Sequence, residues 1–374
     1  MQLVGLEVRD WRNLAHARLE TAARFVVLHG ENAQGKTNLL EAVWLLATLR
    51  SFRERRAERL IRQGAGSLSL KADVVGEGGL RRLGLERSAE SRSLQLDGRA
   101  PQAAADWFAV LRAVLFCPDD AALVRGEPGV RRAFVDRAAF TAWPAHLELV
   151  RDYRRVLAQK SALLRAPRVD RAQLGTWNAQ LVGLGARLMV QRQRVLDELA
   201  PHVDALHAAI AGGGKVGLHV AGLGRGARDE AAAAGKLEER LAAAADEELR
   251  RGMALEGPHR DDLDLQLDGR PARAYASQGQ ARSLVLALKL AELHAARRRG
   301  EAPLFLLDDL TSELDRGRMG RLIDVLAELD NQVWVTTTDP RWLGPLPAQS
   351  TALVRVVDGT IAAGPPLDGG PFSG

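Results

Sequence analysis

The spacing of apolar and polar positions changes along the chain in three successive regions. In the first region, alternation over residues 3–9 predicts a strand, and the apolar run 25–28 predicts a buried one. Helical spacing over 38–49 predicts a helix directly afterwards. Alternation over 67–75 and 80–85 predicts two antiparallel strands. We therefore expect the chain to begin with mixed strands and helices.

The middle region has the pattern of long helices. Apolar residues at steps of three and four form one stripe, through Leu174, Trp177, Leu181, Leu184 and Leu188. Residues 146–164 show a similar stripe. Glycine and proline interrupt the pattern at 166–167, 212–214 and 222–226.

After Gly257 the alternation of strands and helices returns and continues to about Asp358. The α/β pattern is thus split in sequence by a helical module. We predict one α/β domain made of two separated halves, which carries a mostly helical insert.

Composition narrows the class of protein. The chain has 374 residues, 46% of them hydrophobic, which is enough for a sizeable core. Its formal charge of +5 is compatible with an anionic partner such as nucleic acid, and equally with a merely Arg-rich composition. The single cysteine, Cys117, excludes an internal disulfide within this sequence. Without a signal peptide or a long apolar run, we expect a cytoplasmic location and no membrane association.

A phosphate-binding loop lies between the second predicted strand and the helix that follows. The segment fits G-x-x-x-x-G-K-[ST] and consists of Gly30, Glu31, Asn32, Ala33, Gln34, Gly35, Lys36 and Thr37, followed by Asn38. Backbone N–H groups and the helix N-terminus would face the phosphates of ATP, and Lys36 would reach the β- and γ-oxygens. The hydroxyl of Thr37 would bind Mg²⁺.

A second motif supplies carboxylates. The apolar run 304–307 ends in Asp308 and Asp309, as expected for a buried parallel strand that carries acids at its C-terminal end. Asp308 would hold Mg²⁺ through its water shell, and Asp309 would stand where a base or water-positioning group belongs. Together with the phosphate loop, these acids predict a metal–nucleotide site.

Two shorter motifs resemble those of ABC ATPases. Ser277, Gln278, Gly279 and Gln280 open a helix and are similar to the signature that completes the site of the opposite subunit. Glu313, Leu314 and Asp315, just after Asp309, are similar to the D-loop of that superfamily. The four motifs stand in the order that the superfamily shows.

The rest of the chain resembles the RecF family. The similarity includes residues 6–14 (with Trp11-Arg12-Asn13-Leu14), 38–42, 116–126 and 131–136. It continues through Gly257-Pro258-His259-Arg260-Asp261-Asp262-Leu263 and the Asp308 strand, and so covers nearly the whole chain. The resemblance implies an ATPase head in residues 1–118 and 254–364, a helical arm in 119–253 and a flexible tail in 365–374.

The resemblance also implies a mechanism. Two copies would close head to head around two ATP molecules, with Lys36 of one copy and Ser277 of the other at each γ-phosphate. The dimer would bind double-stranded and gapped DNA at single/double-strand junctions and, with RecR and RecO, help RecA to load. It would thereby support replication-fork recovery and the SOS response, and slow, DNA-dependent ATP hydrolysis would release the DNA.

Three positions depart from the expected motifs. Ala33 stands where the family has glycine, so a left-handed backbone there would cost about 1–2 kcal/mol. The switch position reads Thr336-Thr337-Thr338, where many transporters have histidine, so we expect Thr338 to serve as the switch. Asp309 replaces the glutamate of transporters, and its shorter side chain predicts slow hydrolysis.

The DNA contacts are less sharply defined. The candidates are basic clusters soon after the phosphate-loop helix and in one arm helix, namely Arg53, Arg55, Arg56, Arg59, Arg151, Arg154 and Arg155. Each could equally be a solvated surface charge. Two other functions stay open: the nucleotide-binding subunit of an ABC transporter, and a small-molecule P-loop kinase.

Overall fold

The computed structural model describes residues 1–310 and 314–363 of the chain. They form two compact units, each discontinuous in sequence. Unit 1 comprises residues 1–120, 209–211 and the described residues from 292 onward, and unit 2 comprises 121–208 and 212–291. The tail predicted at 365–374 lies outside the described residues.

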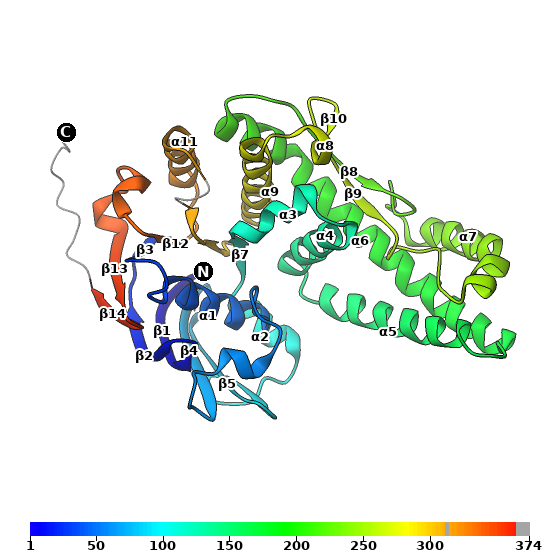
Figure 1. Ribbon diagram of the computed structural model, residues 1–374, viewed down its shortest axis with the longest axis horizontal. Coiled ribbons are helices and arrows are strands. Elements are labelled where there is room, and N and C mark those ends of the chain that lie inside the picture. The colour runs from blue at the N-terminus through cyan, green and yellow to red at the C-terminus, as the bar shows by residue number, and fades with distance from the viewer. Residues whose placement is uncertain (311–313, 364–374) are drawn as a thin grey trace. The chain divides into compact units, whose positions relative to one another are not determined.

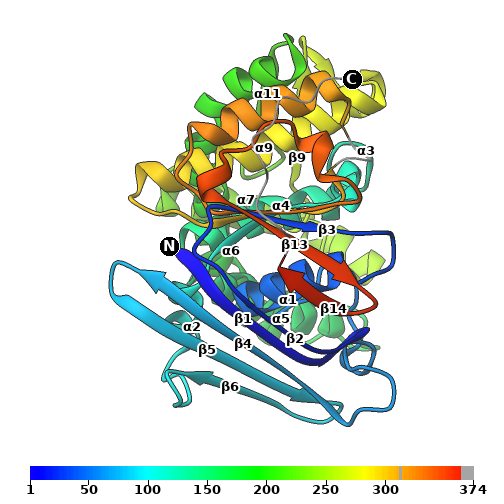
Figure 2. The same cartoon turned by 90° about the vertical axis from the view of Figure 1, so that its left-hand side faces the viewer.

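An antiparallel sheet of five strands forms one layer of unit 1, in the order β2-β1-β4-β5-β6 (Figure 2). The strands are β1 (Gln2–Trp11), β2 (Leu14–Glu20), β4 (Ser67–Gly76), β5 (Gly79–Ser88) and β6 (Arg92–Leu96). Burial alternates along β1 and β4, since Leu6 and Val8, for example, point into the core while Glu7 points outward. This confirms the strands predicted from alternation.

A six-stranded sheet forms a second layer of unit 1, in the order β14-β13-β3-β12-β11-β7. The strands are β3 (Phe25–His29), β7 (Ala113–Phe116), β11 (Leu304–Leu307), β12 (Val333–Thr337), β13 (Thr351–Val357) and β14 (Thr360–Ala363). All neighbours are parallel except β13 and β14. The β7, β11 and β12 strands are buried throughout, as continuous apolar runs in parallel sheets are.

Helix α1 (Lys36–Thr48) contacts both sheets, through β1 and β4 on one side and β7 and β12 on the other (Figure 1). Residues 39–47 are buried without interruption, because a helix enclosed by two layers has no solvent face. The other described helices wholly within unit 1 are η1 (Ala57–Leu60), α2 (Ala104–Val110), α11 (Arg316–Ala327), η3 (Pro340–Leu343) and η4 (Ala348–Ser350).

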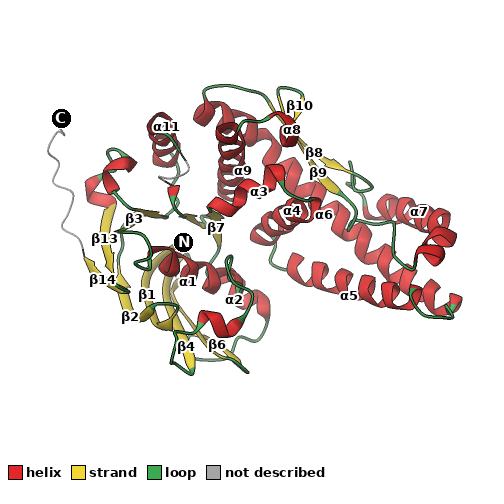
Figure 3. Ribbon diagram, viewed as in Figure 1, coloured by secondary structure: helices red, strands yellow, loops and turns green. Residues whose placement is uncertain are grey.

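Unit 2 is mostly helical (red in Figure 3). Its elements are α3 (Ala122–Arg125), α4 (Pro128–Ala142), α5 (His146–Leu164), α6 (Arg171–Ala211), β8 (Val216–Ala221), α7 (Glu230–Arg251), β9 (Asp262–Leu267), β10 (Arg270–Pro271), α8 (Ala272–Tyr275) and α9 (Gln278–Arg298). The last residues of α6 and α9 belong to unit 1, and η2 (Pro118–Ala121) crosses the boundary. The predicted stripes of α5 and α6 meet in one core cluster around Tyr153, Leu181 and Leu188.

The structure differs from the sequence prediction in two places within unit 2. The middle region contains a strand, β8, which pairs antiparallel with β9. A segment of six residues between two glycine-rich breaks shows too little alternation to predict a strand, and its pairing partner lies more than 40 residues away in the sequence. In addition, residues 254–291 were predicted in the second half of the α/β head but lie in unit 2. They lie there because β9 pairs with β8 and contacts α4.

Within the described part of the chain, no helix combines the length and the apolar character that a membrane span requires.

Candidate functional site

The phosphate loop of unit 1 joins β3 to α1 and has an unusual backbone. Gly30, Ala33 and Gly35 all have positive φ angles, of 145°, 65° and 112°. The loop curls around the Lys36 ammonium group, whose Nζ donates hydrogen bonds to the carbonyls of Gly30 (2.7 Å) and Glu31 (2.6 Å). A lysine inside a ring of backbone at a helix N-terminus is the arrangement that phosphate binding requires.

Neighbouring segments hold this loop from two sides. Asn13, in the turn between β1 and β2, donates from Nδ2 to the carbonyl of Gln34 (3.3 Å) and accepts from Nδ2 of Asn38 (2.7 Å). On the other side, the N–H of Gly359 donates to the same Gln34 carbonyl (3.1 Å). A Cβ at Gly30 would stand 2.3 Å from the Val356 carbonyl oxygen, so only glycine fits there.

The RecF resemblance includes Asn13 but assigns it no role. In the sequence, the sign of a role is a polar side chain just after an alternating strand.

The predicted carboxylates meet the loop at the end of β11. Asp308 accepts at Oδ1 from the hydroxyl of Thr37 (2.8 Å) and from the hydroxyl of Thr336 (2.8 Å). The hydroxyl oxygen of Thr336 in turn accepts from the N–H of Asp309 (2.8 Å). The structure thus brings Thr37 and Asp308 together as predicted from their motifs.

Thr336 is the residue of this site that the sequence prediction missed. Thr338, which we expected to be the switch, is exposed after the end of β12. The Thr336 side chain is instead the one buried against Asp308. Which of three consecutive threonines faces Asp308 depends on the parallel register of β11 and β12, which pairs Leu307 with Val335. No local pattern determines that register. These hydrogen bonds do not involve Thr338, so its role as the switch stays a prediction.

Burial shapes the charges at this site. Removal from water raises the pKa of Asp308, although the hydrogen bonds from Thr37 and Thr336 oppose the shift. Burial lowers the pKa of Lys36, and the nearby charges of Asp309 and Asp308 oppose that shift. Both groups are therefore held where a further charged species, such as a metal–phosphate complex, would compensate their desolvation.

The donor set fits Mg²⁺. The Thr37 hydroxyl and the Asp308 carboxylate are hard oxygen ligands, and their oxygens lie 2.8 Å apart, close enough to act on one ion. An ion there would replace the hydrogen bond between them. Mg²⁺ normally takes its remaining ligands from phosphate and water, so two protein oxygens suffice.

A buried ion pair anchors the helix that carries these residues. Arg12 donates to both oxygens of Glu41 (2.9 and 2.6 Å), and the Glu41 side chain is fully buried within α1. Ser51 also donates to Glu41, and the Trp11 indole donates to the Asn38 carbonyl (2.6 Å). The Trp11-Arg12-Asn13 segment thus holds both the start of α1 and the loop before it.

The signature residues lie in unit 2, where they cap a helix. Gln280 donates from its N–H to Oγ of Ser277 (3.2 Å), and the Ser277 N–H donates to Oε1 of Gln280 (2.8 Å), which together form a capping box. Gln278 and Gly279 form the first residues of α9. Arg125 fixes the preceding backbone by donating to the Ala276 carbonyl (3.0 Å). Ser277 itself is exposed.

The remaining candidates have mixed surroundings. Glu313 of the predicted D-loop lies outside the described residues, Leu314 is buried, and Asp315 caps α11 by accepting from the N–H of Arg318 (2.9 Å). Arg53 donates to Oδ1 of Asn38 (3.0 Å) and thus belongs to the network around the loop.

The other candidate arginines are exposed, in two groups that differ in their acidic neighbours. In unit 1, Arg59 pairs with Glu54 (3.4 Å). In the arm of unit 2, Arg151 and Arg155 lie 3.6 and 3.4 Å from Asp152, and Arg154 lies 4.0 Å from Asp136.

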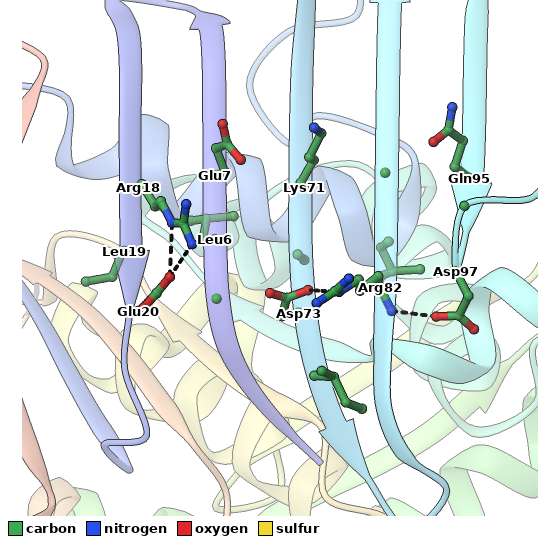
Figure 4. A pocket seen from close by; sticks show the side chains of 16 residues that line it. Leu6, Glu7, Arg18, Leu19, Glu20, Lys71, Asp73, Arg82, Gln95 and Asp97 are labelled. Atoms are coloured by element: carbon green, nitrogen blue, oxygen red, sulfur yellow. Dashed lines mark hydrogen bonds and ion pairs between the residues drawn. The ribbon is translucent and has the colours of Figure 1, made fainter.

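A separate hollow of about 760 Å³ lies on the outer face of the five-stranded sheet (Figure 4). Two pairs of oppositely charged side chains line it: Arg18 with Glu20, both on β2, and Arg82 on β5 with Asp73 on β4 (3.3 Å). Glu7, Lys71 and Asp97 also line it, so acids and bases are nearly balanced. This mixed surface lacks the positive excess that DNA phosphates require.

Comparison with known proteins places these features in a family. The family model "RecF/RecN/SMC N terminal domain" matches residues 2–356. The "DNA replication and repair protein RecF" of Anaeromyxobacter sp. (strain K) is 42% identical over 370 residues, which cover 97% of this chain and 99% of that protein.

Solved structures agree with that result. A structure described as the recombination mediator protein RecF with ATP in the RecFOR pathway is 25% identical, covers 96% of this chain and 97% of its own, and superimposes with a TM-score of 0.86. An SMC head bound to a domain of ScpA is 14% identical, with 98% of each chain covered and a TM-score of 0.58, and so shares the fold. The predicted fold class, an α/β head with a helical insert, is confirmed.

Proposed function

Because the chain belongs to the RecF/RecN/SMC N-terminal-domain family and, within it, to the DNA replication and repair proteins RecF, we propose that it is an ATP-switched DNA clamp of recombinational repair. The observation that carries the proposal is the meeting of Lys36, Thr37 and Asp308 at one point of unit 1. These three side chains supply what a magnesium–triphosphate complex needs, and the side chains of Lys36 and Asp308 are buried at this point.

In this proposal ATP binds first to unit 1. The N–H groups of the loop and Lys36 would hold the phosphates, while Thr37 and Asp308 would hold Mg²⁺, which supplies charge neutralisation between the β- and γ-phosphates. Thr336 would keep the Asp308 carboxylate oriented through its 2.8 Å hydrogen bond. Asp309, whose N–H is tied to Thr336, would position the attacking water, with slow hydrolysis as the outcome.

ATP would then act as the link between two copies of the chain. Ser277 is exposed at the N-terminus of α9, a position suited to contact the γ-phosphate held by a second copy. Only the triphosphate would reach both surfaces, so ATP binding would shift the population toward the dimer.

The dimer would bind double-stranded and gapped DNA through exposed arginines. Arg55 and Arg56 in unit 1 are the best placed, since their guanidinium groups form no ion pair with any residue in 1–310 or 314–363. We further propose RecR, with RecO, as partners, RecA loading as the outcome, and a cytoplasmic location. The SMC-like fold and the RecFOR relative support this assignment.

The test combines sizing with DNA binding. Sedimentation of the wild type, with and without Mg-ATP, should show a monomer that becomes a dimer, and the dimer should bind gapped DNA more tightly than the monomer does. Lys36→Met should abolish both responses, because it removes the charge that faces the phosphates.

Lys71→Met is the matched control, because it removes one lysine from the exposed face of the outer sheet. This variant should behave like the wild type. A wild-type protein that stays monomeric and binds DNA equally with and without ATP would refute the clamp. Lys36 and Lys71 variants with equal defects would refute the assigned nucleotide site.

A further inference from the structure

Tyr275 ends the short helix α8 in unit 2 (Figure 1 labels α8 and β10). Among the large apolar and aromatic side chains of the described residues, Tyr275 has the greatest exposure, 65%. Aromatic rings left in water at a defined position are typical of binding surfaces, because they bury much area at low entropic cost.

The ring is carried on fixed backbone. Ala272 at the start of α8 and Ala276 after its end are buried, and Arg125 donates to the Ala276 carbonyl (3.0 Å). The guanidinium group of Arg270, on β10, lies 5.7 Å from the centre of the Tyr275 ring, within cation–π range. Tyr275 is therefore exposed and oriented at the same time.

The surroundings of the ring select the chemistry of its ligand. Arg270 and Arg273 place positive charge beside it, and of these two only Arg273 forms an ion pair within the described residues, with Glu127 at 3.7 Å. A flat aromatic face beside positive charge suits a flat, anionic ligand, and a nucleotide has both properties.

The position of Tyr275 in the chain indicates which nucleotide its ring would contact. Tyr275 stands two residues before Ser277, and the intervening Ala276 is extended, so the two Cα atoms lie within about 7 Å of each other. If Ser277 contacts the γ-phosphate of ATP, the ribose and base of that molecule extend about as far as the Tyr275 side chain reaches.

We propose that Tyr275, oriented by Arg270, stacks against the nucleobase of the ATP bound to the second copy of the chain. Tyr275 is then a specificity residue for dimer closure, because it contacts the part of ATP that Ser277 does not. The inference rests on the proposed function, since it requires an ATP-dependent dimer.

The experiment compares ATP with magnesium tripolyphosphate, which has the phosphates but no base. Sedimentation would give the dimer dissociation constant for the wild type, Tyr275→Ala and Tyr275→Phe. With ATP, Tyr275→Ala should weaken the dimer about 100-fold, because the dimer holds two ATP molecules and each base loses a stacking contact worth about 10-fold. Tyr275→Phe should match the wild type, since the aromatic face remains. With tripolyphosphate, all three should agree.

Two controls separate this inference from the proposed function. ATP affinity of the monomer, measured at protein concentrations too low for dimers, should be unchanged in Tyr275→Ala, since the proposed stacking contact forms only between two copies. Met253→Ala, which removes another exposed apolar side chain of unit 2 (41% exposed), should leave dimerisation unchanged.

Each contrary result has a distinct meaning. Equal ATP-dependent dimers of the wild type and Tyr275→Ala would overturn the stacking contact but not the clamp. An equal loss with ATP and tripolyphosphate would show that Tyr275 packs on protein instead. A loss confined to single-stranded DNA binding would assign the ring to DNA bases, and a wild type that never dimerises would refute both proposals.

Discussion

At the scale of single residues, Ala33 shows how a motif tolerates a substitution at a cost. Its φ of 65° lies in the left-handed region, where a glycine would have no β-carbon to strain the backbone. The Ala33 side chain is exposed, so it clashes with no core residue. The cost is therefore one of backbone conformation, and a glycine at this position should remove it.

We predict that Ala33→Gly raises the free energy of unfolding by about 0.5–1 kcal/mol. Relief of the left-handed conformation contributes about 1–2 kcal/mol, and the greater freedom of glycine in the unfolded chain removes about 0.4–1 kcal/mol. Denaturant titration measures the difference. Ala15→Gly, at an exposed position of β2 without a positive φ, is the control and should lose about 0.5–1 kcal/mol. A loss of stability in both variants would contradict the strain.

His259 is a second residue whose surroundings lead to a measurable consequence. Burial lowers the pKa of His259 to about 4, although a hydrogen bond to the Ala254 carbonyl opposes the shift. The Tyr153 hydroxyl lies 2.7 Å from Nδ1 of the ring. Where Nδ1 is neutral and accepts the Tyr153 hydroxyl hydrogen, protonation of the ring would turn the hydroxyl from donor to acceptor.

We predict that this buried histidine makes the protein less stable in acid. The unfolded chain takes up a proton at His259 below about pH 6.5, whereas the folded chain does so only near pH 4. The contribution is present above pH 6.5 and is lost as the pH falls toward 4, by about 3 kcal/mol in total. Unfolding of the wild type and of His259→Gln, measured from pH 8 to 4, gives the difference. Parallel curves below pH 6.5 would exclude the effect.

At the scale of elements, the phosphate loop depends on how α1 is anchored. The Arg12–Glu41 pair joins the β1–β2 turn to α1, and neither side chain is well exposed (17% and 0%). Buried pairs of this kind add little net stability when formed, but the loss of one partner leaves a charge without compensation. The pair therefore fixes the position of α1 more than it stabilises the fold.

We predict that Arg12→Ala lowers the free energy of unfolding by about 3–5 kcal/mol, since Glu41 would remain buried without its partner. Arg12→Ala combined with Glu41→Gln should recover part of that loss. Arg18→Ala breaks a pair whose side chains are 66% and 67% exposed, and should leave the free energy of unfolding nearly unchanged. Equal losses for Arg12→Ala and Arg18→Ala would show that burial of Glu41 does not matter.

The elements also show what the sequence could and could not predict. The phosphate loop, α1 and the Asp308 strand were predictable because their motifs are local in sequence. Each motif directly follows a continuous apolar run. Thr336 was not, because its approach to Asp308 depends on the register between two strands about 25 residues apart. β8 was missed for a similar reason, since its stability comes from pairing with β9.

At the scale of the whole molecule, the question is which unit carries the DNA-binding charge. Both candidate groups of arginines are exposed, and sequence alone gave no reason to prefer either. The structure favours unit 1, because Asp152 and Asp136 lie 3.4–4.0 Å from the arm arginines. The guanidinium groups of Arg55 and Arg56 form no ion pair within the described residues. Arg53 is set aside, since it contacts Asn38 in the network around the phosphate loop.

We predict that Arg55 and Arg56 of unit 1 set the salt dependence of DNA binding. In the presence of ATP, replacing both by glutamine should reduce the slope of log affinity against log salt by up to about 1.8, or about 0.9 for each arginine–phosphate pair that the replacement removes. The matched variant replaces Arg151 and Arg155, and so removes the same charge from the arm. Because those charges are partly neutralised within the protein, its slope should stay near that of the wild type. The reverse pattern would place the DNA on the arm, and equal small changes in both would show that neither group binds phosphates.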